Sequence, residues 1–259
     1  MLPIAAWALP GLVLARRAGL PAALLVGAFL WGATAAAPLS AWLNDTLRTR
    51  LELATGGAPP VGFATLVAPV VEEASKSLVL LLLPVLTRRA RANAVRLGIA
   101  LGAASGLGFA ATENVGYLTL AVLQGGLPHL LQATWARGIL AGVKHAVFTA
   151  SAGVGAGLAL CARSRGRAAL AAFAGCIAAV LQHVAWNGLA APLAHEVLCD
   201  APAPDAACAA AAGPLPLFVL APLLAAAALG PGIVALYWLA RRERRGEESA
   251  CHPTGSGHC

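Results

Sequence analysis

Long apolar runs separated by short polar clusters constrain this chain more than any other feature of its sequence. A helix needs roughly 20 apolar residues to cross a bilayer, and the charged fraction of 11% is less than half of the about 25% typical of soluble domains. The sequence therefore predicts an all-α, polytopic transmembrane helix bundle of about seven to eight spans. The candidate spans are residues 2–15, 20–43, 61–87, 95–123, 137–162, 168–192 and 214–240.

The arginines predict an orientation for this bundle. Thirteen of the 18 Lys and Arg residues lie in segments 16–17, 88–96, 163–167 and 241–245, which are every second connection between the runs. Connections rich in Lys and Arg face the cytoplasm, so we expect an N-out, C-in topology. Orientation alone accounts for the net charge of +7, and no nucleic-acid partner is expected.

The remaining organisation is simple. We expect residues 1–240 to form a single transmembrane domain and residues 241–259 to form a basic, disordered cytoplasmic tail. The run 214–240 contains Gly230, Pro231 and Gly232, so it is one kinked helix or two short ones. The predicted topology places the preceding polar loop outside, where an oxidising environment permits a disulfide. The cysteines of that loop are Cys199 and Cys208.

Small residues predict where helices approach closely. Gly98, Gly102 and Gly106 repeat at every fourth position of the fourth run. Such rows allow two helix backbones to come together. The spans that carry the polar residues described below are therefore expected in the centre of the bundle.

Two carboxylates and an ammonium are embedded in the third run. Glu72 and Glu73 stand one helical turn before Lys76, so either carboxylate can reach the ammonium. An ion pair that only joins helices needs one glutamate. The second glutamate is therefore a candidate for a general base, the group that proton-transfer chemistry requires.

The next three runs each add polar side chains. The fourth contains Glu113 and Asn114, the fifth His145, and the sixth His183 and Asn187 one turn apart. Each has a simpler interpretation: Glu113 as an acid near the outer surface, His145 as a packing residue, and His183 with Asn187 as an interhelical pair. Two donors on one helical face also suit an oxyanion hole.

The energetic cost favours one shared site. An acidic residue at the centre of a membrane helix costs roughly 2.5–3.5 kcal/mol, so three lipid-exposed glutamates would cost about 8–10 kcal/mol, which is comparable to the stability of a whole domain. The polar residues of the four runs must therefore converge in the interior. Carboxylates, imidazoles and an amide in one cavity can activate water and hold an oxyanion.

These residues form a pattern that resembles the PrsW family of intramembrane proteases. The motifs are E-E-x-x-K at 72–76, F-x-x-x-E-N at 109–114, a histidine at 145 and H-x-x-x-N at 183–187, within a core of residues 61–192. The resemblance implies a multi-pass peptidase of the bacterial plasma (inner) membrane. It would cleave in or near the membrane segment of a protein substrate, such as an anti-sigma factor.

The resemblance also implies roles for single residues. Glu72 matches the glutamate that activates water, with Glu73 beside it, while His183 and Asn187 match the oxyanion-stabilising pair. Glu113 and His145 complete the catalytic set, and Lys76 and Asn114 support it. The related CAAX-processing endoproteases carry an arginine one position beyond Lys76 and a histidine in place of Glu113, so a prenylated substrate is not expected.

Metal dependence is left open by the sequence. Glu113, His145 and His183 are candidate zinc ligands, with Glu72 or Glu73 as the base. The sequence favours the metal-free alternative, in which a glutamate activates water directly, because it lacks a local H-E-x-x-H pair. Two other functions compete with the peptidase: a noncatalytic membrane scaffold of the same fold, and a proton-coupled transporter, since chains of acids and histidines also relay protons.

Overall fold

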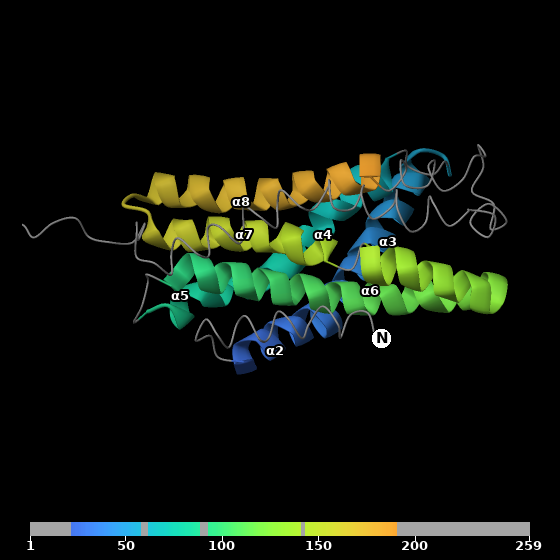
Figure 1. Ribbon diagram of the computed structural model, residues 1–259. Helices are drawn as coiled ribbons and strands as arrows, with labels where there is room; N and C mark the ends of the chain where they lie inside the picture. Colours follow the sequence, from blue (N-terminus) through green and yellow to red (C-terminus); the bar gives the residue numbers. More distant parts are fainter. Residues whose placement is uncertain (1–21, 58–61, 89–92, 141–142, 191–259) are drawn as a thin grey trace, which may run out of the picture.

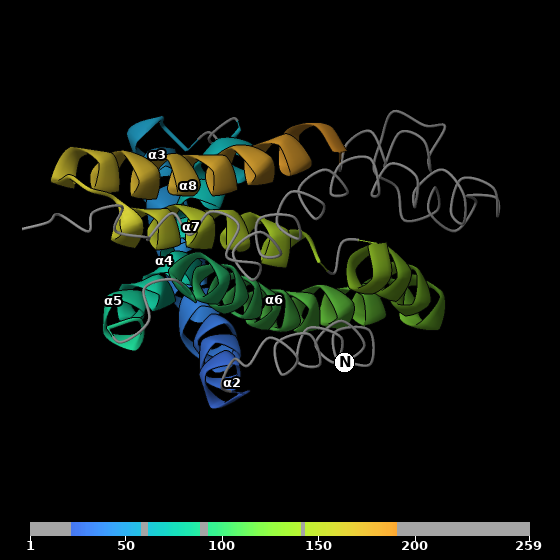
Figure 2. The ribbon, with the colours of Figure 1, turned by 60° about the vertical axis from the view of Figure 1, so that its left-hand side comes forward.

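The computed structural model describes residues 22–57, 62–88, 93–140 and 143–190, and in these ranges it contains helices and no strand. In chain order the helices are α2 (Ala22–Trp31), η1 (Gly32–Ala36), α3 (Ala37–Ala54), η2 (Phe63–Val67), α4 (Ala68–Ser77), η3 (Leu78–Leu82), α5 (Leu83–Leu86), α6 (Ala94–Ala133), η5 (Thr134–Leu140), α7 (Lys144–Cys161), α8 (Arg165–Ala185) and η6 (Trp186–Ala190). Helices α6, α7 and α8 lie side by side, whereas α2 and α3 cross their direction (Figures 1 and 2).

The predicted all-helical membrane architecture is confirmed for the described residues. Three helical stretches, Ala22–Ala54, Ala94–Leu131 and Arg165–Gly188, are long and apolar enough to cross a membrane. The number of spans and their orientation stay predictions. The predicted spans 2–15 and 214–240, the tail, and the predicted Cys199–Cys208 disulfide lie outside the described residues.

The second predicted span continues further than expected. The sequence predicts that this span ends at residue 43, but α3 remains helical to Ala54. Within this extension Arg48 pairs with Asp45 at 2.8 Å, an i,i+3 contact that supports a helix in water. The change from apolar to polar residues therefore does not end the helix.

The predicted close approach of the glycine row is confirmed. A Cβ on Gly98, Gly102 or Gly106 of α6 would collide with the backbone of α7, at Gly153, Thr149 and His145 respectively. The helices therefore touch backbone to backbone, which only small residues permit. Because one of these contacts is at the backbone of His145, the packing of α6 fixes the height of that residue in the bundle.

Helix α4 is short and lies among α3, α6, α7 and α8. It passes into the 3₁₀ turn η3, where the Leu83 N–H bonds to the Leu80 carbonyl, because Pro84 has no N–H with which to continue an α-helix. Carbonyl groups freed near this change are bonded by side chains of other helices. The Trp31 indole donates to the Ser75 carbonyl at 3.2 Å, and the Ser105 hydroxyl donates to the Lys76 carbonyl at 2.9 Å.

Helix α6 reverses direction near its end. Gly125 (φ −156°, ψ 17°) and Gly126 (φ 64°, ψ −145°) leave the helical conformation, and the positive φ of Gly126 is one that glycine adopts without a steric cost. Residues 127–140 return beside the second half of α6 (Figure 1). We name residues 127–140 the return segment. The sequence predicted only an uncharged connection after residue 123.

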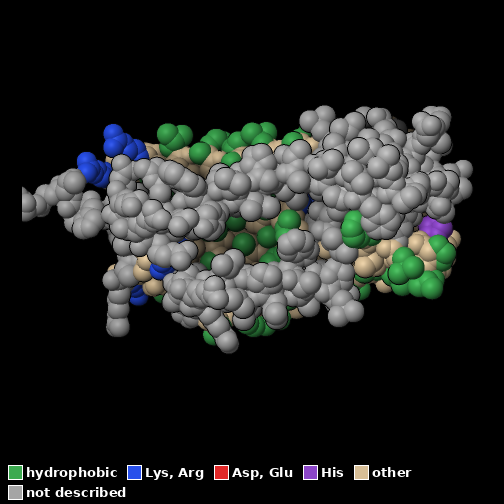
Figure 3. Space-filling model, in the orientation of Figure 1, with side chains coloured by type: hydrophobic (Ala, Val, Ile, Leu, Met, Phe, Trp, Pro, Cys, Tyr) green, Lys and Arg blue, Asp and Glu red, His purple; other side chains and the backbone are tan. Residues whose placement is uncertain are grey.

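Two of the arginine-rich connections, 88–96 and 163–167, have their described residues at the same end of the bundle. Lys and Arg side chains cluster at the left of Figure 3. At this end α5 finishes, α6 begins and α7 passes to α8 (Figure 1). Their common position is what the predicted cytoplasmic side requires.

Candidate functional site

Helix α4 contributes three charged side chains to the interior. Lys76 is fully buried, and its Nζ lies 2.5 Å from Glu73 Oε1 and 3.7 Å from Glu72 Oε2. The spacing of three and four residues predicted from the sequence produces both contacts. The same ammonium lies 4.3 Å from the centre of the Phe109 ring on α6, which stabilises it by a cation–π contact.

Glu73 is bonded through both of its oxygens. Its Oε1 accepts from the Lys76 ammonium and from His183 Nδ1 at 2.9 Å, and its Oε2 accepts from the Thr149 hydroxyl at 2.9 Å. The side chain is only 2% exposed. Because its three donors come from α4, α7 and α8, this buried carboxylate joins the three helices.

The imidazole of His145 connects Lys76 to Glu113. Its Nδ1 lies 3.0 Å from Lys76 Nζ, and its Nε2 lies 2.9 Å from Glu113 Oε2. An ammonium can only donate and a carboxylate can only accept. In neutral His145 the proton is therefore on Nε2, where it is donated to Glu113, and Nδ1 holds the lone pair that Lys76 meets.

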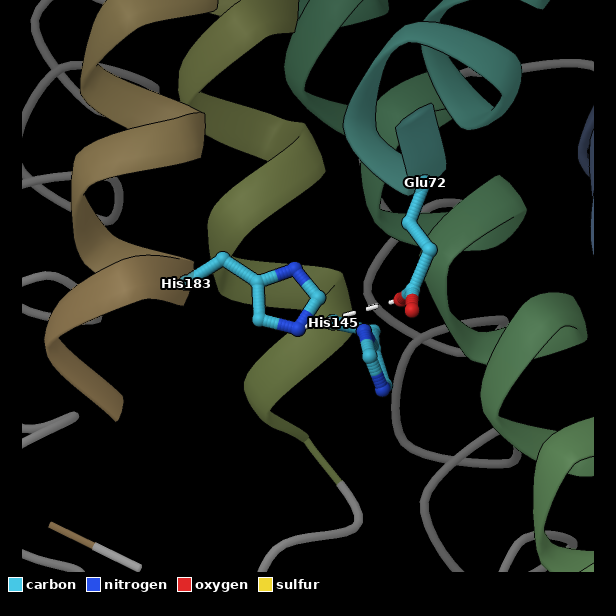
Figure 4. A group of neighbouring side chains, drawn as sticks. All are labelled: Glu72, His145 and His183. Carbon is cyan, nitrogen blue, oxygen red and sulfur yellow. Dashed lines mark ion pairs between the residues drawn. The ribbon is translucent and has the colours of Figure 1, made fainter. Parts of the chain in front are cut away.

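The same reasoning gives His183 the opposite tautomer. Its Nδ1–H donates to Glu73, so Nε2 carries the lone pair. That nitrogen faces Glu72 Oε2 at 3.8 Å (Figure 4). Glu72 Oε2 is buried and has no hydrogen-bond partner among the described residues. Two acceptors that face each other cannot bond directly, so a proton donor or a cation belongs between them.

Glu72, His145 and His183 together form a group that fits a metal ion. One donor atom from each lies within 4.8 Å of the others, and the three side chains come from α4, α7 and α8 (Figure 4). One carboxylate and two imidazoles are a ligand set found in catalytic zinc sites. The carboxylate of Glu73 on His183 and that of Glu113 on His145 supply the outer contacts that orient metal-binding histidines.

The structure brings most of the predicted site residues together. Glu72, Glu73, Lys76, Glu113, His145 and His183 form one connected cluster. The predicted metal ligands differ from the observed group in one member: Glu113 contacts His145 and Arg137, and Glu72 stands beside the two histidines instead.

Asn187 and Asn114 contact residues at the edge of this cluster. The Asn187 amide donates to the Ala64 carbonyl at 3.1 Å and so joins η6 to η2. Asn114 is paired with Arg137 in the return segment. The oxyanion role predicted for Asn187 with His183 stays a prediction.

Comparison with known proteins agrees with this geometry. The chain matches the description "PrsW family intramembrane metalloprotease" over residues 20–227, which is most of its length. The chain belongs to the PrsW family. This confirms the resemblance and extends it beyond the expected core of 61–192. No curated protein and no solved structure matches the chain.

Membership of the PrsW family changes the weight given to a metal. The sequence favoured a metal-free site, whereas the family is described as a metalloprotease. Glu72 Oε2 has no hydrogen-bond partner among the described residues, and the Nε2 lone pair of His183 faces it. These two atoms suit a cation independently of the family description. The residues present therefore fit the metal that the family description implies.

Two polar residues of the site were missed in the sequence. Thr149 bonds Glu73, and Arg137 bonds Glu113. Thr149 stands one helical turn after His145, and this i,i+4 spacing could have indicated that both face the same interior. Arg137 carried no such signal, because its position depends on the reversal at Gly126.

Proposed function

We propose that this PrsW family member is an endopeptidase that hydrolyses a peptide bond in or near the membrane segment of a substrate protein. The observation that carries the proposal is the pair of buried acceptors, Glu72 Oε2 and His183 Nε2, which face each other at 3.8 Å. Such a pair binds and polarises a water molecule. The surrounding network holds both side chains from separate helices.

The proposed chemistry assigns the proton to Glu72. This carboxylate takes a proton from water while the water oxygen bonds to the carbonyl carbon of the substrate. When the carbon–nitrogen bond breaks, the proton passes to the leaving amine. Glu73 holds His183 in the tautomer that directs its Nε2 lone pair at the water. Asn187 is the proposed donor to the oxyanion; His183, predicted for the same role, would join it only when Nε2 also carries a proton, because its Nδ1–H is donated to Glu73.

A metal-dependent form of the same site is the alternative: Glu72, His145 and His183 would hold a zinc ion or a similar divalent metal, and Glu72 would then be a ligand and not the base. When bound, such an ion supplies a Lewis acid that polarises the carbonyl and lowers the pKa of water. The Lys76 ammonium lies 3.0 Å from the His145 Nδ1 lone pair. His145 can therefore serve as a ligand only when this ammonium moves aside.

The depth of the site suggests where the substrate is cut. Three site residues each lie 17 or 18 residues from an arginine at the arginine-rich end of the bundle: Glu113 from Arg96, His145 from Arg163 and His183 from Arg165. At 1.5 Å per residue this is roughly 26 Å, most of the about 30 Å hydrocarbon core. With the arginine end in the cytoplasm, the cleaved bond would lie near the outer boundary of the membrane.

The proposed substrate is a membrane-anchored protein of the bacterial plasma membrane, for example an anti-sigma factor. A site near the outer boundary of the bilayer is within reach of the outer end of a segment that crosses the membrane. The proposal treats residues 1–240 as a single peptidase domain. The substrate partner is thus protein and lipid-embedded, and no nucleic acid is involved.

The direct test is cleavage of a co-expressed single-span substrate by wild type and Glu72→Ala. The expected result is loss of cleavage in Glu72→Ala, with folded protein recovered at the wild-type level. Glu52→Ala is the matched control, because Glu52 lies in the last turn of α3, outside the cluster. Cleavage by Glu72→Ala at the wild-type rate would exclude the proposal.

The same experiment separates the two competing functions. A noncatalytic scaffold predicts that wild type shows no cleavage and that Glu72→Ala fails to fold. A proton-coupled transporter predicts proton uptake in proteoliposomes that depends on Glu72. The open acceptor pair favours the peptidase, because a residue that only joins helices would have its carboxylate bonded.

A further inference from the structure

The return segment delivers one cation to the edge of the site. About a dozen residues separate Gly126 from Asn114 on one arm and from Arg137 on the other, so both arms cover roughly 18 Å of helix. Arms of equal length bring Arg137 back to the level of Glu113 and Asn114. The reversal at Gly126 is therefore what places this arginine.

Arg137 is held there by contacts on several sides. Its Nε donates to Asn114 Oδ1 at 3.3 Å, and the Asn114 amide donates back to the Arg137 carbonyl at 3.4 Å. The guanidinium carbon lies 3.4 Å from the centre of the Tyr117 ring. This reciprocal pair with a buried asparagine fixes both the backbone and the side chain of Arg137, which a lysine could not reproduce.

The guanidinium uses a second nitrogen on Glu113. Arg137 Nη2 lies 3.1 Å from Glu113 Oε2, and this same oxygen accepts from His145 Nε2 at 2.9 Å. Arg137 thus holds the carboxylate that accepts from His145 Nε2. Arg137 forms no ion pair with Glu72 or Glu73 in the described structure.

We propose that Arg137 is a positioning residue of the site, which acts through Glu113 on His145. The proposal rests on the proposed function and assigns the F-x-x-x-E-N motif a division of roles. Glu113 orients His145, and Asn114 anchors the arginine that orients Glu113. The return segment is in this sense part of the site, although it contains none of the reacting groups.

The test compares Arg137→Gln, Arg137→Lys, Glu113→Gln and the double variant Arg137→Gln/Glu113→Gln. Outer contacts of this kind are worth about 10- to 100-fold in activity, so we expect Arg137→Gln to lower kcat by that factor with KM nearly unchanged. Arg137→Lys should recover part of the loss, because an ammonium can reach Glu113 but cannot also fork to Asn114. Arg165→Gln, at an exposed arginine of the opposite end, is the matched control.

The double variant distinguishes positioning from general stability. If Arg137 acts through Glu113, adding Arg137→Gln to Glu113→Gln costs less than about threefold more, because coupled residues are not additive. Equal losses in both backgrounds, or wild-type kcat in Arg137→Gln, would overturn the proposal. A loss of kcat that is matched by a lower unfolding temperature would do the same.

A second readout does not depend on catalysis. In protein labelled with ¹⁵N-histidine, the Nε2–H tautomer of His145 is expected in both proteins, because Lys76 still meets Nδ1, but the Nε2–H signal should shift in Arg137→Gln, where Glu113 is no longer held. An unchanged His145 Nε2–H signal in Arg137→Gln would overturn the proposal. If wild type cleaves no substrate, the proposed function fails, and this spectrum still decides whether Arg137 orients His145 through Glu113.

Discussion

Glu72 and Glu73 are neighbours in the sequence, yet we expect substitution of Glu73 to lower stability and substitution of Glu72 to abolish cleavage. Glu73 accepts hydrogen bonds from Lys76, His183 and Thr149, and glutamine can replace only one acceptor oxygen. Hydrogen bonds to charged groups contribute about 1.5–3 kcal/mol each, and breaking a buried ion pair costs about 3–5 kcal/mol. We therefore expect Glu73→Gln to lower the free energy of unfolding by about 3–5 kcal/mol.

Glu72→Gln should leave stability almost unchanged. Its Oε2 has no hydrogen-bond partner among the described residues, and the nearest cation, Lys76 Nζ, is 3.7 Å away. Removing a carboxylate charge that is so weakly compensated should change the free energy of unfolding by less than about 1 kcal/mol. Cleavage should nevertheless be abolished, because the amide cannot take a proton from water.

Thermal unfolding in detergent and cleavage in proteoliposomes measure the two effects separately. At about 2–4 °C per kcal/mol for a chain of this size, Glu73→Gln should unfold roughly 6–20 °C below wild type, and Glu72→Gln within about 4 °C of it. Equal unfolding temperatures for the two variants would refute the assignment of Glu73 to structure. Normal cleavage by Glu72→Gln would refute the assignment of Glu72 to chemistry.

Three further predictions test other parts of the site. In the metal-dependent form of the site, chelation should abolish cleavage by wild type and Zn²⁺ should restore it, and the metal content of purified protein should fall in His183→Ala but not in the control Gln182→Ala; full activity without metal would leave direct activation of water by Glu72 as the mechanism. Gly106→Ala should lower the free energy of unfolding by about 1–3 kcal/mol through overpacking against the His145 backbone, and it should lower kcat. Gly116→Ala, where a Cβ meets nothing within 4 Å, should have neither effect. Asn187→Ala should lower the free energy of unfolding by about 0.5–1.5 kcal/mol for the lost bond to Ala64 and should lower kcat by about 10²- to 10³-fold; a loss of kcat below tenfold would contradict the proposed oxyanion role.

Much of the site could be predicted from the sequence because the bilayer limits where charge can go. Glu72, Glu73 and Lys76 lie within one helical turn, so their contact follows from helix geometry alone. Glu113, His145 and His183 stand on different helices, but the cost of exposing an acid to lipid requires that they converge. The polar cluster observed in the described residues is the arrangement that this argument requires.

The partners within the cluster could not be predicted in the same way. His183 bonds Glu73 and faces Glu72, 110 and 111 residues earlier in the chain. Which glutamate takes which role depends on the rotation of α4 about its axis, and no local pattern fixes that rotation. The position of Arg137 depends on the reversal at Gly126. Composition alone predicts only a connection between two spans at that point.

The glycine contacts have a consequence for access to the site from the lipid. Backbone meets backbone between α6 and α7, and Gly155 and Gly175 make the same kind of contact between α7 and α8. At these glycines no side chain separates the helices, so they cannot part there without losing backbone contact. Among the described helices, α6, α7 and α8 thus form one closely packed layer, and we expect a substrate segment to reach Glu72 from the side of α4. Crosslinks between α4 and α8 should block the enzyme, whereas crosslinks between α6 and α7 should leave it open.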